Sequence, residues 1–241
     1  YWYVWADTNP QTGGFRFRQN FSADARKFWT QGKAEELGPH ELAVHAARMA
    51  TRRKRIEKGQ LSKVFGITKV HGPEAVVEEG LGLTISYFVP GLYEKLSLEG
   101  KFQVDASILR GMVYGNLHVE LANNPSLSLE DAIGYVRRYI PWESKEQIEK
   151  EKRDRTEDPL LSTYRFAYNA LKFLNYAHTL NDAGKKNFLR EVYQKPYTGD
   201  QVENLYRELI SEPRFRGGDL NDSIYKTDNS TQLPSGNYFV S

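Results

Sequence analysis

Two histidines and a glutamate lie close together in the string His-Glu-x-x-x-His, which runs from His40 to His45. Neutral imidazoles are common zinc ligands, and a glutamate beside them can take a proton from an attacking water. A catalytic zinc site uses three protein ligands and keeps a fourth position open for that water. We therefore expect His40 and His45 to be two of the three zinc ligands, with Glu41 as the base that activates the zinc-bound water.

The separation of the two histidines constrains the helix that carries them. In a regular α-helix each residue rotates the chain by about 100°, so residues five positions apart point about 140° away from each other. Two ligands of one ion must converge instead. A π-type turn between Glu41 and His45 would restore the convergence, and such turns are frequent at functional sites. The spacing therefore predicts a local irregularity in this helix.

A third ligand is available about thirty residues downstream, in the string Glu78-Glu79-Gly80-Leu81-Gly82. This string lies at the start of a predicted helix over 74–88, and its glycines allow a neighbouring helix to approach closely. Two neutral imidazoles and one carboxylate leave a divalent ion with a net positive charge, which lowers the pKa of bound water. The same ligand set also serves non-haem iron, but a water-activating base such as Glu41 favours zinc and hydrolysis.

The two strings together resemble the HExxxH and E/Q-E-G-L-A signatures of the tyrosine carboxypeptidase family, which includes microtubule-associated enzymes and bacterial QEGLA-motif relatives. The resemblance implies zinc bound by His40, His45 and Glu79, with Glu41 catalytic and a single-domain, zincin-like (gluzincin-type) metallopeptidase fold. It further implies removal of a C-terminal residue, often tyrosine, from a protein or peptide. Ala43 and Gly82 depart from the family pattern, which puts the choice of substrate in doubt more than the binding of metal.

Carboxypeptidase action needs a cation for the terminal carboxylate of the substrate, because an unpaired buried charge is costly. The segment 162–168 resembles an arginine-containing helix of the same family, and Arg165 is our candidate for binding that carboxylate. Tyr164 and Tyr168 lie near the same helical face and could donate a hydrogen bond to the developing oxyanion. Both tyrosines are equally consistent with an ordinary aromatic core.

The composition of the chain limits the class of protein and the kind of metal site that it can form. The chain has 241 residues, of which 39% are apolar, no cysteine and a formal net charge of +2. Without cysteine, any metal must be held by His, Asp or Glu. No apolar run approaches the roughly 18 residues that a membrane span needs, and no signal-type leader opens the sequence. We expect a soluble, cytoplasmic protein with no membrane partner.

The remaining patterns predict a mainly α fold with a minor β element (α+β). Alternation in Phe15-Arg16-Phe17-Arg18 predicts a short strand, and Gly13-Gly14 predicts a turn before it. We expect a metallopeptidase domain over 1–212, which contains the zinc site at 40–79 and a helical half at 104–211. A tail over 213–241 is expected to form an extended arm or a mobile end. Helices are expected over 22–37, 39–58, 74–88, 104–122, 160–180, 183–193 and 199–211, with an exposed helix or linker over 144–158. A further helix is expected after a capping box at Ser128 and Asp131, carrying Ile133, Val136 and Tyr139.

Two other functions remain open at this stage. The chain could be a catalytically inactive, metal-stabilised binding module, although such a site has no use for a base at Glu41. Alternatively, the basic run from Arg48 to Lys58 could bind an acidic partner, such as an acidic protein tail, while the histidines are incidental. The small net charge argues against nucleic acid as that partner.

Overall fold

The computed structural model describes residues 29–66, 72–165, 167 and 170–217, together with the backbone of 4–8 and 15–19. It is mostly helical, and one two-stranded antiparallel hairpin is its only sheet within these ranges. The elements are β1 (Val4–Thr8), β2 (Phe15–Gln19), α2 (Gln31–Gly38), the π-helix η1 (Pro39–Ala46), α3 (Ala47–Glu57), the 3-10 helix η2 (Lys63–Gly66), α4 (Ala75–Phe88), α5 (Leu92–Lys95), α6 (Leu98–Asn123), α7 (Leu129–Tyr139), α8 (Lys145–Thr156), α9 (Pro159–Arg165), α10 (Ala170–Thr179), α11 (Asp182–Gln194), α12 (Gly199–Ser211) and the 3-10 helix η3 (Pro213–Phe215).

The expected strand at Phe15 is confirmed as β2. Its partner β1 was not predicted; the two strands pair from Thr8 opposite Phe15 to Val4 opposite Gln19. The expected turn at Gly13-Gly14 lies outside the described residues. Both strands contact η1, so the hairpin lies against the segment that carries the two histidines.

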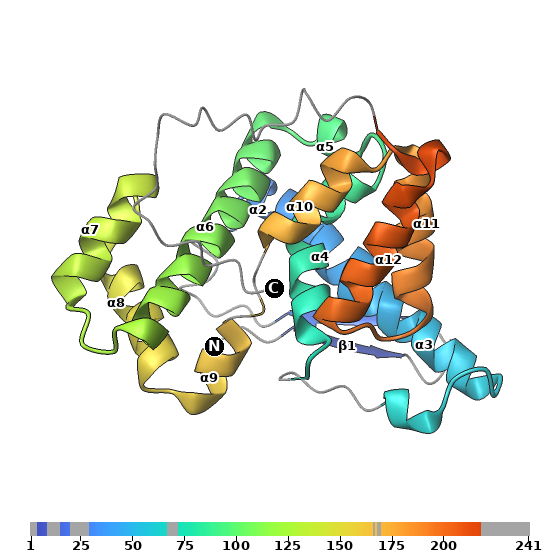
Figure 1. Ribbon diagram of the computed structural model, residues 1–241, viewed down its shortest axis with the longest axis horizontal. Coiled ribbons are helices and arrows are strands. Elements are labelled where there is room, and N and C mark those ends of the chain that lie inside the picture. The colour runs from blue at the N-terminus through green and yellow to red at the C-terminus, as the bar shows by residue number, and fades with distance from the viewer. Residues whose placement is uncertain are drawn as a thin grey trace.

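Helix α4 lies near the centre of the molecule, with α11 and α12 on one side and α6 on the other, and α10 packs against both α4 and α6 (Figure 1). Its sequence is apolar on nearly every face, which is typical of a helix buried all round. Leu81 and Phe88 pack there against Phe173 and Phe188 in the larger hydrophobic core. This burial carries the polar pair Glu78-Glu79 into the interior along with the helix.

A second hydrophobic core joins the C-terminal half of α6 to α7 and α8, through Leu117, Val136, Ile140 and Ile148. The segment 144–158 was predicted to be an exposed helix or linker. It forms helix α8, but the expected exposure is wrong for one face of the helix, because Ile148 is completely buried. A third, smaller cluster joins the N-terminal half of α6, through Val104 and Ile108, to Ala170 at the start of α10. Helix α6 thus takes part in two of the three hydrophobic clusters of the described residues (Figure 1).

Helix α6 begins at Leu98, six residues before the predicted start, where the Ser97 hydroxyl caps the helix by accepting from Gly100 N–H, and α2 packs closely against its first turns. The Glu35 carboxylate accepts hydrogen bonds from the backbone and hydroxyl of Ser97, at 2.9 and 2.7 Å. A Cβ added to Gly100 would lie 2.1 Å from Glu35 Oε2, and one added to Gly32 would lie 2.5 Å from Glu99 Cγ. Glycine inside a predicted helix usually weakens it, but here it permits the close approach of two helices.

The single helix predicted over 160–180 is also wrong. The chain forms α9 and then α10, with Ala167 in a turn between them. Helix α9 packs on α8, whereas α10 packs on α4 and α6. This break allows α9 to face the candidate site.

The C-terminal helices follow the prediction closely. Thr198 and Gln201 form the expected capping box of α12. The first residues of the predicted tail are packed rather than free, since Phe215 is buried and Gly217 N–H donates to Thr179 O at 2.7 Å. No helix within the described ranges is both long and apolar enough to cross a membrane.

Candidate metal centre

The segment with the two histidines forms the π-helix η1, as the five-residue spacing predicts. At its end, Ala47 N–H donates to Leu42 O, five residues back. The wider turn brings His40 Nε2 and His45 Nε2 to 3.2 Å from each other. The expected convergence of the two imidazoles is therefore confirmed.

The Glu79 carboxylate reaches the same point from α4. Its Oε2 lies 3.5 Å from His40 Nε2, and its Oε1 lies 3.7 Å from His45 Nε2. Ligand atoms about 2.0–2.2 Å from a tetrahedral ion lie about 3.3–3.6 Å from each other, so the three side chains have the spacing of a metal site. Glu79 Oε2 is buried and has no hydrogen-bond partner among the described residues, which leaves it available to a ligand.

Glu41 offers a second carboxylate to the same centre. One ligand atom each from His40, Glu41 and His45 lies within 4.8 Å of the other two, so this His-Glu-His cluster could also hold a metal ion. The two carboxylates differ in their surroundings: Glu41 lines the open cleft, whereas Glu79 is 5% exposed and lies behind the histidines. This difference suits Glu79 to binding an ion and Glu41 to meeting a substrate.

Hydrogen bonding keeps Glu79 ionised despite its burial. Desolvation alone would raise the pKa of this carboxyl, but His40, His45 and Tyr164 outweigh it and hold the pKa below its ordinary value. The Tyr164 hydroxyl donates to Glu79 Oε1 at 2.7 Å, from α9. Tyr164 thus lies at the centre as predicted, but its hydroxyl contacts a candidate ligand. Tyr168 lies outside the described residues.

Glu78, next to Glu79, lies on the outer side of His45. Its Oε2 is 3.7 Å from His45 Nδ1, and its Oε1 accepts a hydrogen bond from Arg52 at 2.7 Å. Arg48 NH1 lies 3.9 Å from the same oxygen. Burial raises the pKa of the Glu78 carboxyl, but the hydrogen bond with His45 and the charges of Arg48 and Arg52 outweigh burial and lower the pKa to about 2. Glu78 is therefore a permanent anion beside His45.

The basic run from Arg48 to Lys58 therefore contains both buried and exposed side chains. Arg48 is only 1% exposed and Arg52 is also buried, so both serve the interior. Arg53, Lys54 and Lys58 remain exposed, and Arg53 pairs with Glu57 at 2.9 Å. The run is therefore not one surface, and the four-residue spacing of Arg48 and Arg52, which places them on one helical face, is the sequence signal that separates them from the exposed residues.

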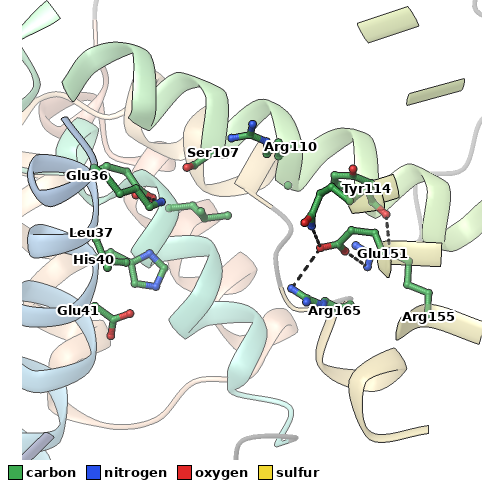
Figure 2. A pocket seen from close by; sticks show the side chains of 14 residues that line it. Glu36, Leu37, His40, Glu41, Ser107, Arg110, Tyr114, Glu151, Arg155 and Arg165 are labelled. Atoms are coloured by element: carbon green, nitrogen blue, oxygen red, sulfur yellow. Dashed lines mark hydrogen bonds and ion pairs between the residues drawn. The ribbon is translucent and has the colours of Figure 1, made fainter. Parts of the chain in front are cut away.

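A cleft of about 260 Å³ opens in front of His40 and Glu41. Figure 2 shows its two walls: Glu36, His40 and Glu41 on one side, and Glu151, Arg155 and Arg165 on the other, with α6 across the back. Arg165, the predicted carboxylate-binding residue, thus faces the candidate centre across the cleft. It donates to Asp154 at 3.0 Å and lies 3.7 Å from Glu151, so its charge already has partners.

The chain matches no protein-family model, and comparisons with curated proteins and with solved structures find no similar chain. The resemblance to the tyrosine carboxypeptidase family therefore rests on the two sequence motifs. The geometry of the centre is an independent observation, because it depends on the positions of η1 and α4 in space.

Gly82 on α4 lies directly against the His40 ring. A Cβ added there would lie 2.6 Å from His40 Cε1 and 2.8 Å from both ring nitrogens. We predict that Gly82→Ala displaces the His40 ring and weakens zinc binding by about 10-fold or more, as measured by competition with a chelator. Gly115→Ala on α6 is the matched control, since nothing lies within 4 Å of its added Cβ. Unchanged affinity in Gly82→Ala would contradict the observed packing of His40.

The charge of His45 predicts a pH dependence of metal binding. Burial lowers the pKa of this imidazole, but Glu78, Glu79 and Glu41 outweigh burial and raise the pKa from 6.5 to about 9. At pH 7 the metal-free side chain is protonated, and a metal ligand must be neutral. We expect zinc binding at pH 7 to release about one proton from His45, and zinc affinity to fall about tenfold per pH unit below 9. Calorimetry in buffers of different ionisation enthalpy measures the release, and a value near zero would contradict the raised pKa.

Proposed function

We propose that the protein is a zinc-dependent metallopeptidase with a zincin-like centre, acting as a carboxypeptidase. The observation that carries the proposal is the convergence of His40, His45 and Glu79 from η1 and α4, with Glu41 facing the cleft beside them. A purely structural metal site has four protein ligands and needs no such carboxylate in the open cleft. The combination favours hydrolysis over a binding-only role.

A bound divalent zinc ion supplies a Lewis acid that lowers the pKa of water and polarises a carbonyl group. Glu41 is suited to the proton transfers. Desolvation raises the pKa of its carboxyl above the ordinary value, while the His40 and His45 imidazoles oppose this shift. A base with a raised pKa can take a proton from water in the cleft and later give it to the leaving amine.

Tyr164 takes a different role from the one expected. Its hydroxyl donates to Glu79 Oε1, so we propose that it fixes the orientation of this ligand. The hydroxyl lies close enough to the centre to turn toward a developing oxyanion when substrate is present.

The far wall of the cleft supports the choice of a carboxypeptidase. Arg165 and Arg155 line it, Arg110 lines the cleft from α6, and each of the three pairs with a carboxylate of the protein. A substrate carboxylate could replace one of these partners at Arg165, whose side chain is 25% exposed. Arg155 is held more deeply, since it donates both to Glu151 and to the backbone oxygen of Tyr114. Arg165 therefore remains our candidate for the C-terminal carboxylate.

The first test is the metal content of the purified protein, measured by elemental mass spectrometry. We expect about one zinc per wild-type chain, and loss of zinc in His45→Ala and in Glu79→Ala, because each removes one of three protein ligands. His178→Ala is the matched control, since this histidine is exposed and lies on α10 outside the centre. A folded wild-type protein that contains no zinc and takes up none would rule out the proposal.

The second test separates metal binding from catalysis. We expect Glu41→Gln to keep zinc but to lose about 10²- to 10⁴-fold in the rate of peptide hydrolysis, because it lacks the base. The measurement is mass spectrometry of peptides with a free C-terminus, beside the same peptides carrying a C-terminal amide, which should resist trimming. Zinc without any hydrolysis in the wild-type protein would favour the inactive binding module instead.

A further inference from the structure

The hydroxyl of Tyr193, on α11, donates a hydrogen bond to the backbone oxygen of Ala43 in η1. Ala43 lies between the two histidines, so this bond joins a distant helix to the middle of the π-helical segment. Tyr193 does not line the cleft and plays no part in the chemistry proposed above. Its contact calls for another explanation.

The backbone hydrogen bonding of η1 explains the contact between Tyr193 and Ala43. Ala47 N–H donates to Leu42 O, five residues back, and the regular helix α3 begins at Ala47. Where the backbone hydrogen bonds change from the i→i−5 pattern of a π-helix to the i→i−4 pattern of an α-helix, one carbonyl oxygen accepts no hydrogen bond from a helix N–H group. The carbonyl that follows Leu42 in the chain is that of Ala43, which the Tyr193 hydroxyl contacts.

This contact matters because a carbonyl shielded from water needs a donor. Ala43 packs against the larger hydrophobic core, together with Tyr193 itself. If the segment instead adopted regular α-helical pairing, His40 and His45 would point about 140° apart and could not share an ion. A donor at Ala43 O favours the π-helical form over that alternative.

We infer that Tyr193 is a positioning residue for the metal centre: its hydroxyl stabilises the π-helical form of η1, and so keeps His40 and His45 convergent. The inference rests on the metal centre of the proposed function. It gives α11, which contacts α3 and α4, a role in metal binding although none of its residues is a candidate ligand.

The test compares Tyr193→Phe with Tyr206→Phe. Each variant removes one hydroxyl and keeps the ring; Tyr206 lies in the same core, and its hydroxyl is 2.9 Å from that of Thr179, remote from η1. Zinc affinity is measured by competition with a chelator, and the visible absorption of the cobalt-loaded protein reports the ligand geometry. We expect Tyr193→Phe to bind zinc about tenfold more weakly and to change the cobalt spectrum, with Tyr206→Phe unchanged in both.

A purely structural role of the hydroxyl would lower the stability of the metal-free and metal-loaded protein equally, without changing affinity or spectrum. That result for Tyr193→Phe, in a protein whose wild type binds metal, would overturn this inference and leave the proposed function intact. A wild-type protein that binds neither zinc nor cobalt would overturn both. Replacement of Tyr193 by p-aminophenylalanine restores a donor, and we expect it to restore the affinity; failure to do so would also contradict the inference.

Discussion

The centre depends on one geometric constraint: residues five positions apart on a regular α-helix cannot bind the same ion. The chain meets it by widening the helix between His40 and His45, which brings their Nε2 atoms to 3.2 Å. The wider turn is the less stable form of an isolated helix, so its surroundings must favour it. Tyr193 on α11 and the packing of η1 against α4 are among the contacts in a position to do so.

The buried charges around this turn form a balanced group. The carboxylates of Glu41, Glu78 and Glu79 face the cations of Arg48, Arg52 and protonated His45. Burial of an unpaired charge is costly. Arg52 and Glu79 have hydrogen-bond partners, whereas Arg48 has only the ion pair with Glu78 at 3.9 Å and no side-chain hydrogen bond within the described residues. Exchange of the His45 proton for a divalent ion would leave the cluster with a net positive charge, the condition that hydrolytic chemistry needs.

Local patterns in the sequence predicted the parts of the structure that short-range physics determines. The spacing of His40 and His45 predicted the π-helix, and the capping box at Thr198 predicted the start of α12. Contacts between distant segments were missed, among them the Tyr193 hydroxyl on η1. The early start of α6 and the break between α9 and α10 belong to the same class, because each is accompanied by packing against a helix far away in the sequence. The mainly helical class could be predicted, whereas the arrangement of the helices could not.

The π-helical turn has an evolutionary consequence for the histidine spacing. Five residues in the wider turn rotate the chain by about as much as four residues of a regular α-helix, which is why His40 and His45 converge. Loss of one codon between Glu41 and His45 would therefore keep the two imidazoles convergent and would leave the orientation of α2 relative to α3 nearly unchanged. The close fit of α2 to α6 at Gly32 and Gly100 would survive such a deletion, so the longer and the shorter motif are one mutational step apart.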